Sequence, residues 1–239
     1  MIRNTRLSHA LRIPALIAAI APGAIGVTLT PTSAVAASPM VKTQAPGFYR
    51  IMLGEFEVTV INDGTTLLDV DKPLAEPPAK TEAALKRSFE ANPVETSNNA
   101  FLINTGSKLV LIDTGAGTLL GPTLGKLLVN VRAAGYEPEQ IDDVFLTHMH
   151  PNHVGGLVAN GALAFPNATI HANKRDSDYW MSQANLDKAP SDAKGYFQGV
   201  MAAVNPYVGA GKYQPFDTDG ELVPGVRSIA TPGHTAGHT

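Results

Sequence analysis

The sequence predicts a mixed α/β fold built in layers, and three observations support this prediction. Runs typical of β-strands alternate along the chain with segments that place apolar residues at helical spacing. The run IDDVFLT, residues 141–147, has the apolar character of a strand that is buried on both faces. It follows a helical segment that stops at Gly135, so strand, helix and strand come in the order of an α/β layer fold.

The first half of the chain is expected to contain two hairpins and a helix. Residues 48–53 and 55–61 predict the first hairpin, because the second run alternates apolar and polar side chains. A Pro-rich loop follows, and residues 80–91 then predict a short amphipathic helix that includes Phe89 on its apolar side. Residues 99–115 predict a second hairpin, whose strands are joined through the turn-like sequence TGS.

The second half is expected to alternate helices with strands. Residues 121–135 place four apolar side chains, beginning with Leu124, at helical spacing before the glycine stop. The other elements are expected as a strand at 168–172, helices at 175–183 and 194–204, and a last strand from Val226 that runs into a turn.

The first 36 residues have the three-part pattern of a secretory signal peptide. Three arginines without an acid precede a long apolar run, and small residues follow at Ala34 and Ala36. A membrane anchor is the competing interpretation, but Pro22 and Gly23 interrupt the apolar run and favour cleavage. We therefore expect a signal peptide at 1–36, a leader at 37–47, one domain at 48–239, and an exported protein, periplasmic or secreted, with no membrane segment after cleavage.

Composition excludes some classes of site and partner. The chain has 239 residues, of which 44% are hydrophobic and 16% are charged, and it contains no cysteine. Any metal ion must therefore be held by histidine, carboxylate or amide groups. Lysine and arginine form no basic stripe and the net charge is -3, which argues against a nucleic-acid partner. The oligomeric state stays open, with a homodimer among the options.

Five of the seven histidines lie in two short segments. His148, His150 and His153 fall within LTHMHPNHVGG, directly after the buried strand, and His234 and His238 fall near the last residue. Side chains two apart on an extended segment point the same way, and a helix start at Pro151 would return the third imidazole toward them. Clustered neutral imidazoles are typical ligands of zinc and similar ions, so the first segment predicts a metal site.

Three segments in order resemble the metallo-β-lactamase superfamily: LVLIDTGAG, THMHPNHVGG and TPGHTAGH. From about Pro46 to the last residue, the chain resembles most the methyl parathion hydrolase type of organophosphorus hydrolase. This resemblance implies an αββα sandwich with two divalent metal ions, most simply zinc, at the loop edge between two sheets. The implied activity is attack of a metal-bound hydroxide on a phosphotriester, an aryldialkylphosphatase-like reaction.

The resemblance also assigns roles to particular residues. It implies that His148, His150 and His234 bind the first ion and that His153 binds the second. Asp113 would orient a ligand imidazole or brace the loop, although a plain turn residue in DTG is an equal interpretation. His238 has no ligand role in the pattern and is expected to be a hydrogen-bonding turn residue.

Two departures from the family pattern limit these expectations. Asn152 stands where the pattern has an aspartate, and an amide neither attracts a dication as a carboxylate does nor takes up a proton. The second metal site should therefore be weakened. The pattern also supplies a bridging Asp and another His after TPGHTAGH, whereas this sequence ends at Thr239. We therefore expect a fragment of a longer protein, with the sandwich incomplete at its C-terminus.

The substrate is the least constrained part of the prediction. Trp180 and Phe197 match aromatic positions that line the leaving-group pocket in the organophosphorus branch, and the third such position is Leu120, which is not aromatic. Aromatic side chains at helical positions are also common core residues. A small-molecule ester is the expected substrate. A lactonase or other ester hydrolase is the enzyme alternative, and a protein that binds a ligand with one metal ion or none is the non-enzyme alternative.

Overall fold

The structure is a computed structural model that describes residues 38–74, 76–217 and 219–239. Residues 44–239 form one compact unit. The signal peptide expected at 1–36 lies outside the described residues and stays a prediction, as does the division into domains. Among the helices that the structure describes, none is long and apolar enough to cross a membrane.

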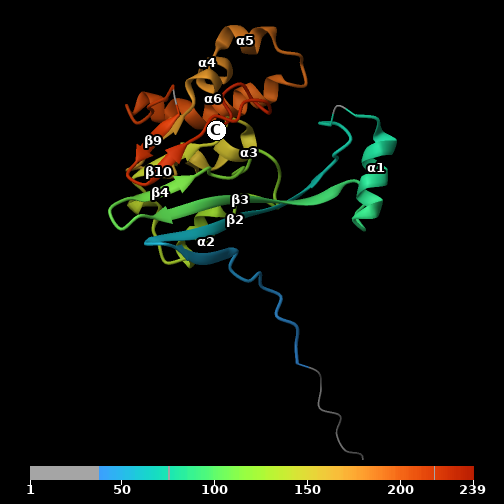
Figure 1. Ribbon diagram of the computed structural model, residues 1–239, viewed down its shortest axis with the longest axis horizontal. Coiled ribbons are helices and arrows are strands. Elements are labelled where there is room, and N and C mark those ends of the chain that lie inside the picture. The colour runs from blue at the N-terminus through green and yellow to red at the C-terminus, as the bar shows by residue number, and fades with distance from the viewer. Residues whose placement is uncertain (1–37, 75, 218) are drawn as a thin grey trace, which may run out of the picture. The chain divides into compact units, whose positions relative to one another are not determined.

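A six-stranded sheet organises this unit, in the order β1-β2-β3-β4-β5-β8 (Figure 1). The strands are β1 (Phe48–Leu53), β2 (Phe56–Leu68), β3 (Val94–Asn104), β4 (Leu109–Ile112), β5 (Asp143–Leu146) and β8 (Thr169–Ala172). The first four pair antiparallel, so both predicted hairpins are confirmed. β4, β5 and β8 pair parallel. The predicted mixed α/β fold is therefore confirmed.

Short helices and two small ribbons complete the unit. The helices are α1 (Pro78–Arg87), α2 (Leu127–Ala133), α3 (Pro151–Val154), α4 (Lys174–Trp180), α5 (Gln183–Lys188) and α6 (Lys194–Gly209), with 3-10 turns at Pro138–Gln140 and Gly155–Leu157. The ribbons pair β6 (Val158–Ala159) with β7 (Ala162–Leu163) and β9 (Gly220–Val223) with β10 (Val226–Ser228). α2 lies beside β2, α6 packs against α3, and α4 and α5 lie on the far side of α6 from the sheet (Figure 1).

The expected helices differ from their predicted bounds, and in α1 and α2 the difference moves an apolar residue out of the helix. α1 begins at Pro78, where proline suits a first helical turn, and ends at Arg87. Phe89 was expected on its apolar face, but it lies beyond the helix with φ 59° and is 98% exposed. Leu124 was expected inside the next helix, yet it is a buried residue of the loop before α2. In both cases the apolar residue has the spacing of a helix face but lies outside the residues whose backbone is helical.

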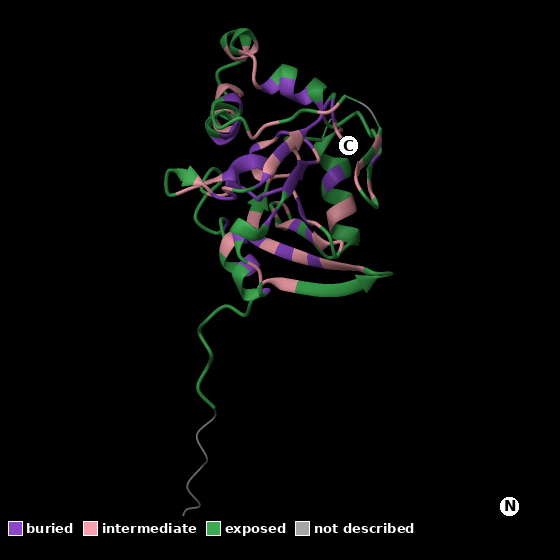
Figure 2. Cartoon of the chain, turned by 90° about the vertical axis from the view of Figure 1, so that its left-hand side faces the viewer, coloured by how far each residue is buried: buried purple, intermediate pink, exposed green. Residues whose placement is uncertain are grey.

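The core is built where the central strands meet the helices, as the purple segments of Figure 2 show. All four residues of β5 are buried, as predicted from IDDVFLT. On α6, Tyr207 is buried and its hydroxyl donates to the Leu157 carbonyl and accepts from the Phe165 amide, each at 3.0 Å. Burial raises the pKa of Tyr207 to about 12, so this hydroxyl keeps its proton and both hydrogen bonds.

Gly156, in the turn after α3, packs directly against the loop that follows β4. A Cβ at this position would lie 1.9 Å from the Thr114 carbonyl oxygen, a backbone atom that cannot rotate away. Gly156→Ala is therefore expected to lower the free energy of unfolding by about 3 kcal/mol, at the upper end of overpacking costs. Urea denaturation monitored by circular dichroism measures this difference.

The control for this prediction is Gly195→Ala in α6, where nothing lies within 4 Å of the new Cβ. Alanine has the higher helix propensity, so this variant should keep or gain stability. Equal stability of the Gly156→Ala and Gly195→Ala variants would show that the two loops do not need their close contact.

Candidate metal centre

The first histidine segment follows β5 without a break. His148 lies two residues after the strand, and His150 is the N-cap of α3 with φ -79° and ψ 154°. Pro151 takes the first helical position, where its missing N–H costs nothing. The predicted helix start at Pro151 is therefore confirmed. An extended N-cap followed at once by a helical turn brings three histidines of one short segment to the same place.

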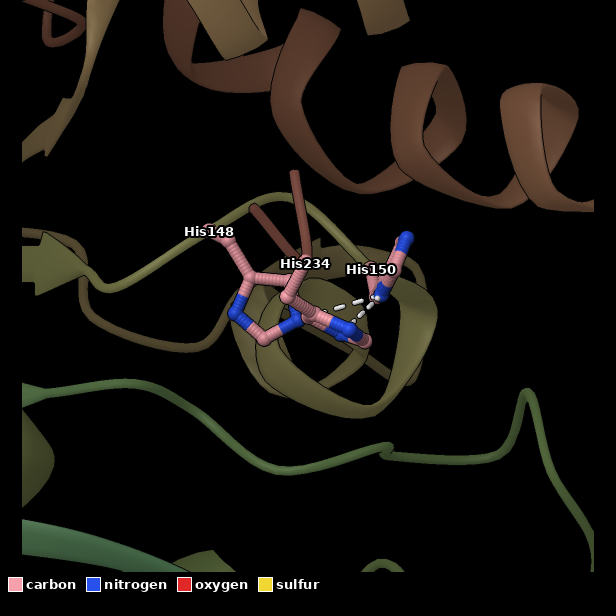
Figure 3. Close-up of side chains that lie close together, drawn as sticks. All are labelled: His148, His150 and His234. Carbon is pink, nitrogen blue, oxygen red and sulfur yellow. Dashed lines mark hydrogen bonds between the residues drawn. The ribbon is translucent and has the colours of Figure 1, made fainter. Parts of the chain in front are cut away.

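Three imidazoles meet at this point (Figure 3). The Nδ1 atom of His150 lies 3.1 Å from His148 Nε2 and 3.0 Å from His234 Nε2. The three candidate ligand atoms all lie within 4.8 Å of one another. Three nitrogens that ligate one tetrahedral zinc ion lie about 3.3 Å apart, given zinc–nitrogen distances of about 2.0–2.1 Å. The residues present therefore fit a divalent ion of this kind.

The surroundings of His148 and His150 keep both side chains neutral, which is the form that ligates metal. Burial, followed by the positive charges that the neighbouring histidines would carry, lowers the pKa of His148 to about 2. The same causes lower the pKa of His150 to about 4. His148 is 4% exposed, so water cannot screen a charge there.

These lowered pKa values predict how the metal-free chain responds to acid. Above about pH 6.5 both histidines are neutral in the folded and unfolded chain, so they add no pH dependence. Below this pH the unfolded chain binds protons that the folded chain does not bind. The free energy of unfolding therefore falls until the pH reaches the pKa of these histidines in the folded chain. Between pH 7.5 and 5.5 the free energy of unfolding should drop by roughly 2 kcal/mol. Urea denaturation at the two pH values measures it, and a pH-independent result would contradict the prediction.

His153 points its Nδ1 atom at a carboxylate rather than at the other histidines. The distance from His153 Nδ1 to Asp113 Oδ2 is 2.8 Å. A carboxylate can only accept here, so the imidazole carries its proton on Nδ1 and leaves Nε2 free to ligate. The rings of His148 and His153 lie 3.9 Å apart, centroid to centroid. Among the described residues, however, the three-histidine cluster does not include His153.

The Asp113 carboxylate hydrogen-bonds both with the His153 imidazole and with Thr147 in the loop after β5. Its Oδ1 atom accepts from the Thr147 amide and its Oδ2 atom accepts from the Thr147 hydroxyl, each at 2.8 Å. Asp113 adopts φ 61°, a conformation that aspartate tolerates better than most residues. The position of this side chain thus suits both predicted roles, orientation of an imidazole and support of the loop. The interpretation as a plain turn residue explains its backbone conformation but not these side-chain hydrogen bonds.

Asn152 lies on α3 between His150 and His153. Its backbone carbonyl accepts from Asn98 Nδ2 at 2.9 Å. Among the described residues, its side-chain amide has no hydrogen-bond partner. His238 hydrogen-bonds through Nδ1 with the Thr231 hydroxyl at 2.7 Å, as expected of a turn residue.

Asp176 is a residue of this site that the sequence does not reveal. It lies in the first turn of α4, is 1% exposed and borders the same cavity as His150 and His234. Its carboxylate accepts hydrogen bonds from Met149, Thr235 and Gly237. No sequence signal separates it from the other acidic residues of a short polar helix, because its partners are distant in the chain.

A cavity of about 460 Å³ opens beside the histidines, and Trp180 forms part of its wall. The Trp180 ring meets His150 edge to face, with the centroids 5.2 Å apart. Phe197 is 2% exposed and lies behind Trp180, with the centroids of the two rings 4.7 Å apart. Leu120 lines a second cavity, of about 220 Å³, beside Pro151. Of the three predicted substrate residues, only Trp180 therefore faces the cavity at the histidines.

Comparisons with known proteins find hydrolases that are similar to this chain in sequence and fold. The chain is 34% identical to the hydrolase AbOPH of the beta lactamase superfamily, with a TM-score of 0.75, over 82% of this chain and 69% of that one. It is 29% identical to AidC, a dizinc quorum-quenching lactonase solved with the product N-hexnoyl-L-homoserine, with a TM-score of 0.72, over 80% and 68%.

An N-acyl homoserine lactonase of Bacillus sp is 29% identical over 157 residues, which is 58% of this chain and 54% of the relative. The chain thus spans about half the length of the curated relatives it matches. The family model of the metallo-beta-lactamase superfamily matches residues 93–239, which include every histidine of the cluster. With most of its length matched by that model, the chain belongs to the metallo-β-lactamase superfamily.

Proposed function

We propose that this chain is a metal-dependent hydrolase of ester-type bonds, with a lactone as the substrate that the observations favour. The observation that carries the proposal is the cluster of His148, His150 and His234 beside a cavity large enough for a small molecule. Two of the similar proteins are lactonases, one of them dizinc. This favours the lactonase alternative over the phosphotriesterase.

Each part of the site contributes a separate function. His148, His150 and His234 would hold one divalent ion, and His153 offers Nε2 toward a second. A bound divalent ion lowers the pKa of water and polarises the substrate carbonyl. The cavity wall holds the apolar part of the substrate, with Trp180 beside His150. The Asn152 amide oxygen can accept a hydrogen bond but cannot take up a proton, so Asn152 would not serve as a general base.

Aryl phosphotriester hydrolysis remains the second candidate. It is supported by the sequence segments that resemble the methyl parathion hydrolase type and by the aromatic ring of Trp180 in the cavity wall. Against it, Phe197 is covered by the core and Leu120 faces another cavity. Of the three positions that line the leaving-group pocket in the organophosphorus branch, only Trp180 therefore borders this cavity, although Tyr179 adds a second aromatic ring to its wall.

Steady-state kinetics on the zinc-loaded chain test the proposal. We expect kcat/KM to be at least about 10-fold higher for an N-acyl homoserine lactone than for methyl paraoxon, an aryl phosphotriester. Removal of the metal with a chelator should abolish both reactions, and added zinc should restore them. The reverse order of kcat/KM would favour the phosphotriesterase. If calorimetry showed lactone binding but no product formed, the chain would be a binding protein.

A further inference from the structure

Two segments far apart in the sequence form the candidate metal centre, so other contacts must fix the position of one segment relative to the other. One is the loop 147–150 after β5, and the other is the turn 233–238 near the last residue. Both contain histidines of the cluster, and neither is a regular element. The relative position of their imidazoles therefore depends on the hydrogen bonds that join them.

Asp176 supplies such bonds to both segments at once. The Met149 amide, between two ligand histidines, donates to Oδ2 at 3.1 Å. From the turn, the Thr235 hydroxyl donates to Oδ2 at 2.8 Å and the Gly237 amide donates to Oδ1 at 2.7 Å. Three donors on one carboxylate that is 1% exposed satisfy its charge without a cation.

The packing at this junction is too close to be a loose contact. A Cβ on Gly237 would lie 2.7 Å from the backbone nitrogen of Asp176 and 2.9 Å from its Oδ1 atom. The turn is thus pressed against the first turn of α4, and glycine alone permits this approach. One further hydrogen bond joins the first segment to the residue directly after the turn, from the Thr239 amide to the Thr147 carbonyl at 3.0 Å.

We infer that Asp176 is a positioning residue that sets the distance between His234 and the pair His148–His150, and so sets the affinity of the site for its metal ion. The inference rests on the metal site of the proposed function, but it concerns binding and not hydrolysis. Asp176 need not contact the ion, because it acts through the backbone of both ligand segments. Groups that orient ligands in this way contribute about 10–100-fold to metal affinity.

The first test is Asp176→Asn, which keeps the shape of the side chain and removes one acceptor. Either orientation of the amide turns its NH₂ group toward Met149 or toward Gly237, so one of the two segments loses a hydrogen bond to residue 176. We expect the Kd for Zn²⁺, measured by competition with a chelating dye, to rise about 10–100-fold. The visible absorption of the Co²⁺ form should change as well, because the ligand geometry changes.

The matched control is Asp63→Asn. Asp63 is another buried carboxylate that accepts two backbone hydrogen bonds, from Ala116 and Leu127, and it joins neither histidine segment. This variant should lose a comparable amount of stability and keep the wild-type Kd and Co²⁺ spectrum. If Asp63→Asn weakened Zn²⁺ binding as much as Asp176→Asn does, the loss of affinity would follow from a general loss of stability, and the inference would be wrong.

A milder pair of variants keeps the test valid if Asp176→Asn fails to fold. Thr235→Val removes the hydroxyl that donates to Asp176, and Thr235→Ser retains it. We expect Thr235→Val to weaken Zn²⁺ binding and Thr235→Ser to keep the wild-type Kd. Unchanged Kd values in Asp176→Asn, or in Thr235→Val where the former does not fold, would overturn the inference. A chain with Asp176-dependent zinc binding and no hydrolysis would support it and overturn the proposed function instead.

Discussion

Replacing His148 with glutamine is expected to lower the affinity for Zn²⁺ at least about 100-fold, since loss of groups outside the ligand set already costs 10–100-fold. His148 is the most buried of the three clustered histidines, and its Nε2 atom faces His150 Nδ1 at 3.1 Å. A glutamine amide is a poorer ligand for zinc than an imidazole nitrogen. Competition with a chelating dye measures the affinity, and hydrolysis by the zinc-loaded chain should fall with it.

The matched control replaces a histidine that lies outside the cluster. His171, on β8, hydrogen-bonds with Asp143 at 3.0 Å and with the Gln214 carbonyl at 3.1 Å. His171→Gln should lower stability and leave the Zn²⁺ affinity unchanged. If both variants bound zinc as the wild type does, the cluster would not be the metal site.

The second large effect is expected for Asn152→Asp. As it stands, the chain should bind about one equivalent of zinc tightly, because the described residues bring only three histidines together and Asn152 is uncharged. A carboxylate at 152 would add charge and a strong ligand beside His153. We expect a second equivalent by elemental analysis and hydrolysis at least about 10-fold faster.

A change of charge elsewhere separates this effect from simple electrostatics. Asn160 is exposed, beyond the turn that follows α3, and Asn160→Asp adds the same charge away from the cluster. It should change neither the zinc content nor the rate. Equal rates for Asn152→Asp and the wild type would mean that the amide is tolerated at this position, and two equivalents in the wild type would show that the second site is not weakened.

Local sequence patterns predicted much of the fold and one half of the site. The buried strand β5, the helix start at Pro151 and both hairpins follow from spacing, proline and turn residues over a few positions. The convergence of His148 and His150 follows from the same local geometry. Their meeting with His234 was expected only from the family resemblance, and the structure brings the three together. Their roles as ligands stay predictions that the variants above test.

The features that the sequence did not predict depend on contacts between distant segments. Phe89 has the right spacing for a helix face, but α1 ends first and no neighbour covers the ring. α5 was missed, because its six residues carry no apolar stripe and none of them is buried. Asp176 has partners 27, 59 and 61 residues away, so nothing in its own surroundings in the chain marks it.

The position of His234 in the chain has a consequence for how the metal ion would act during folding. His234 lies 84 residues after His150, so the ligand set is complete only when the turn that contains His234 has docked on the loop after β5. Contacts between segments so far apart have a larger entropic cost than local hairpins, so the ion would gain most of its binding free energy late in folding. Interactions absent from the transition state slow unfolding without speeding folding. Zinc is therefore expected to lengthen the lifetime of the folded chain while leaving its folding rate nearly unchanged.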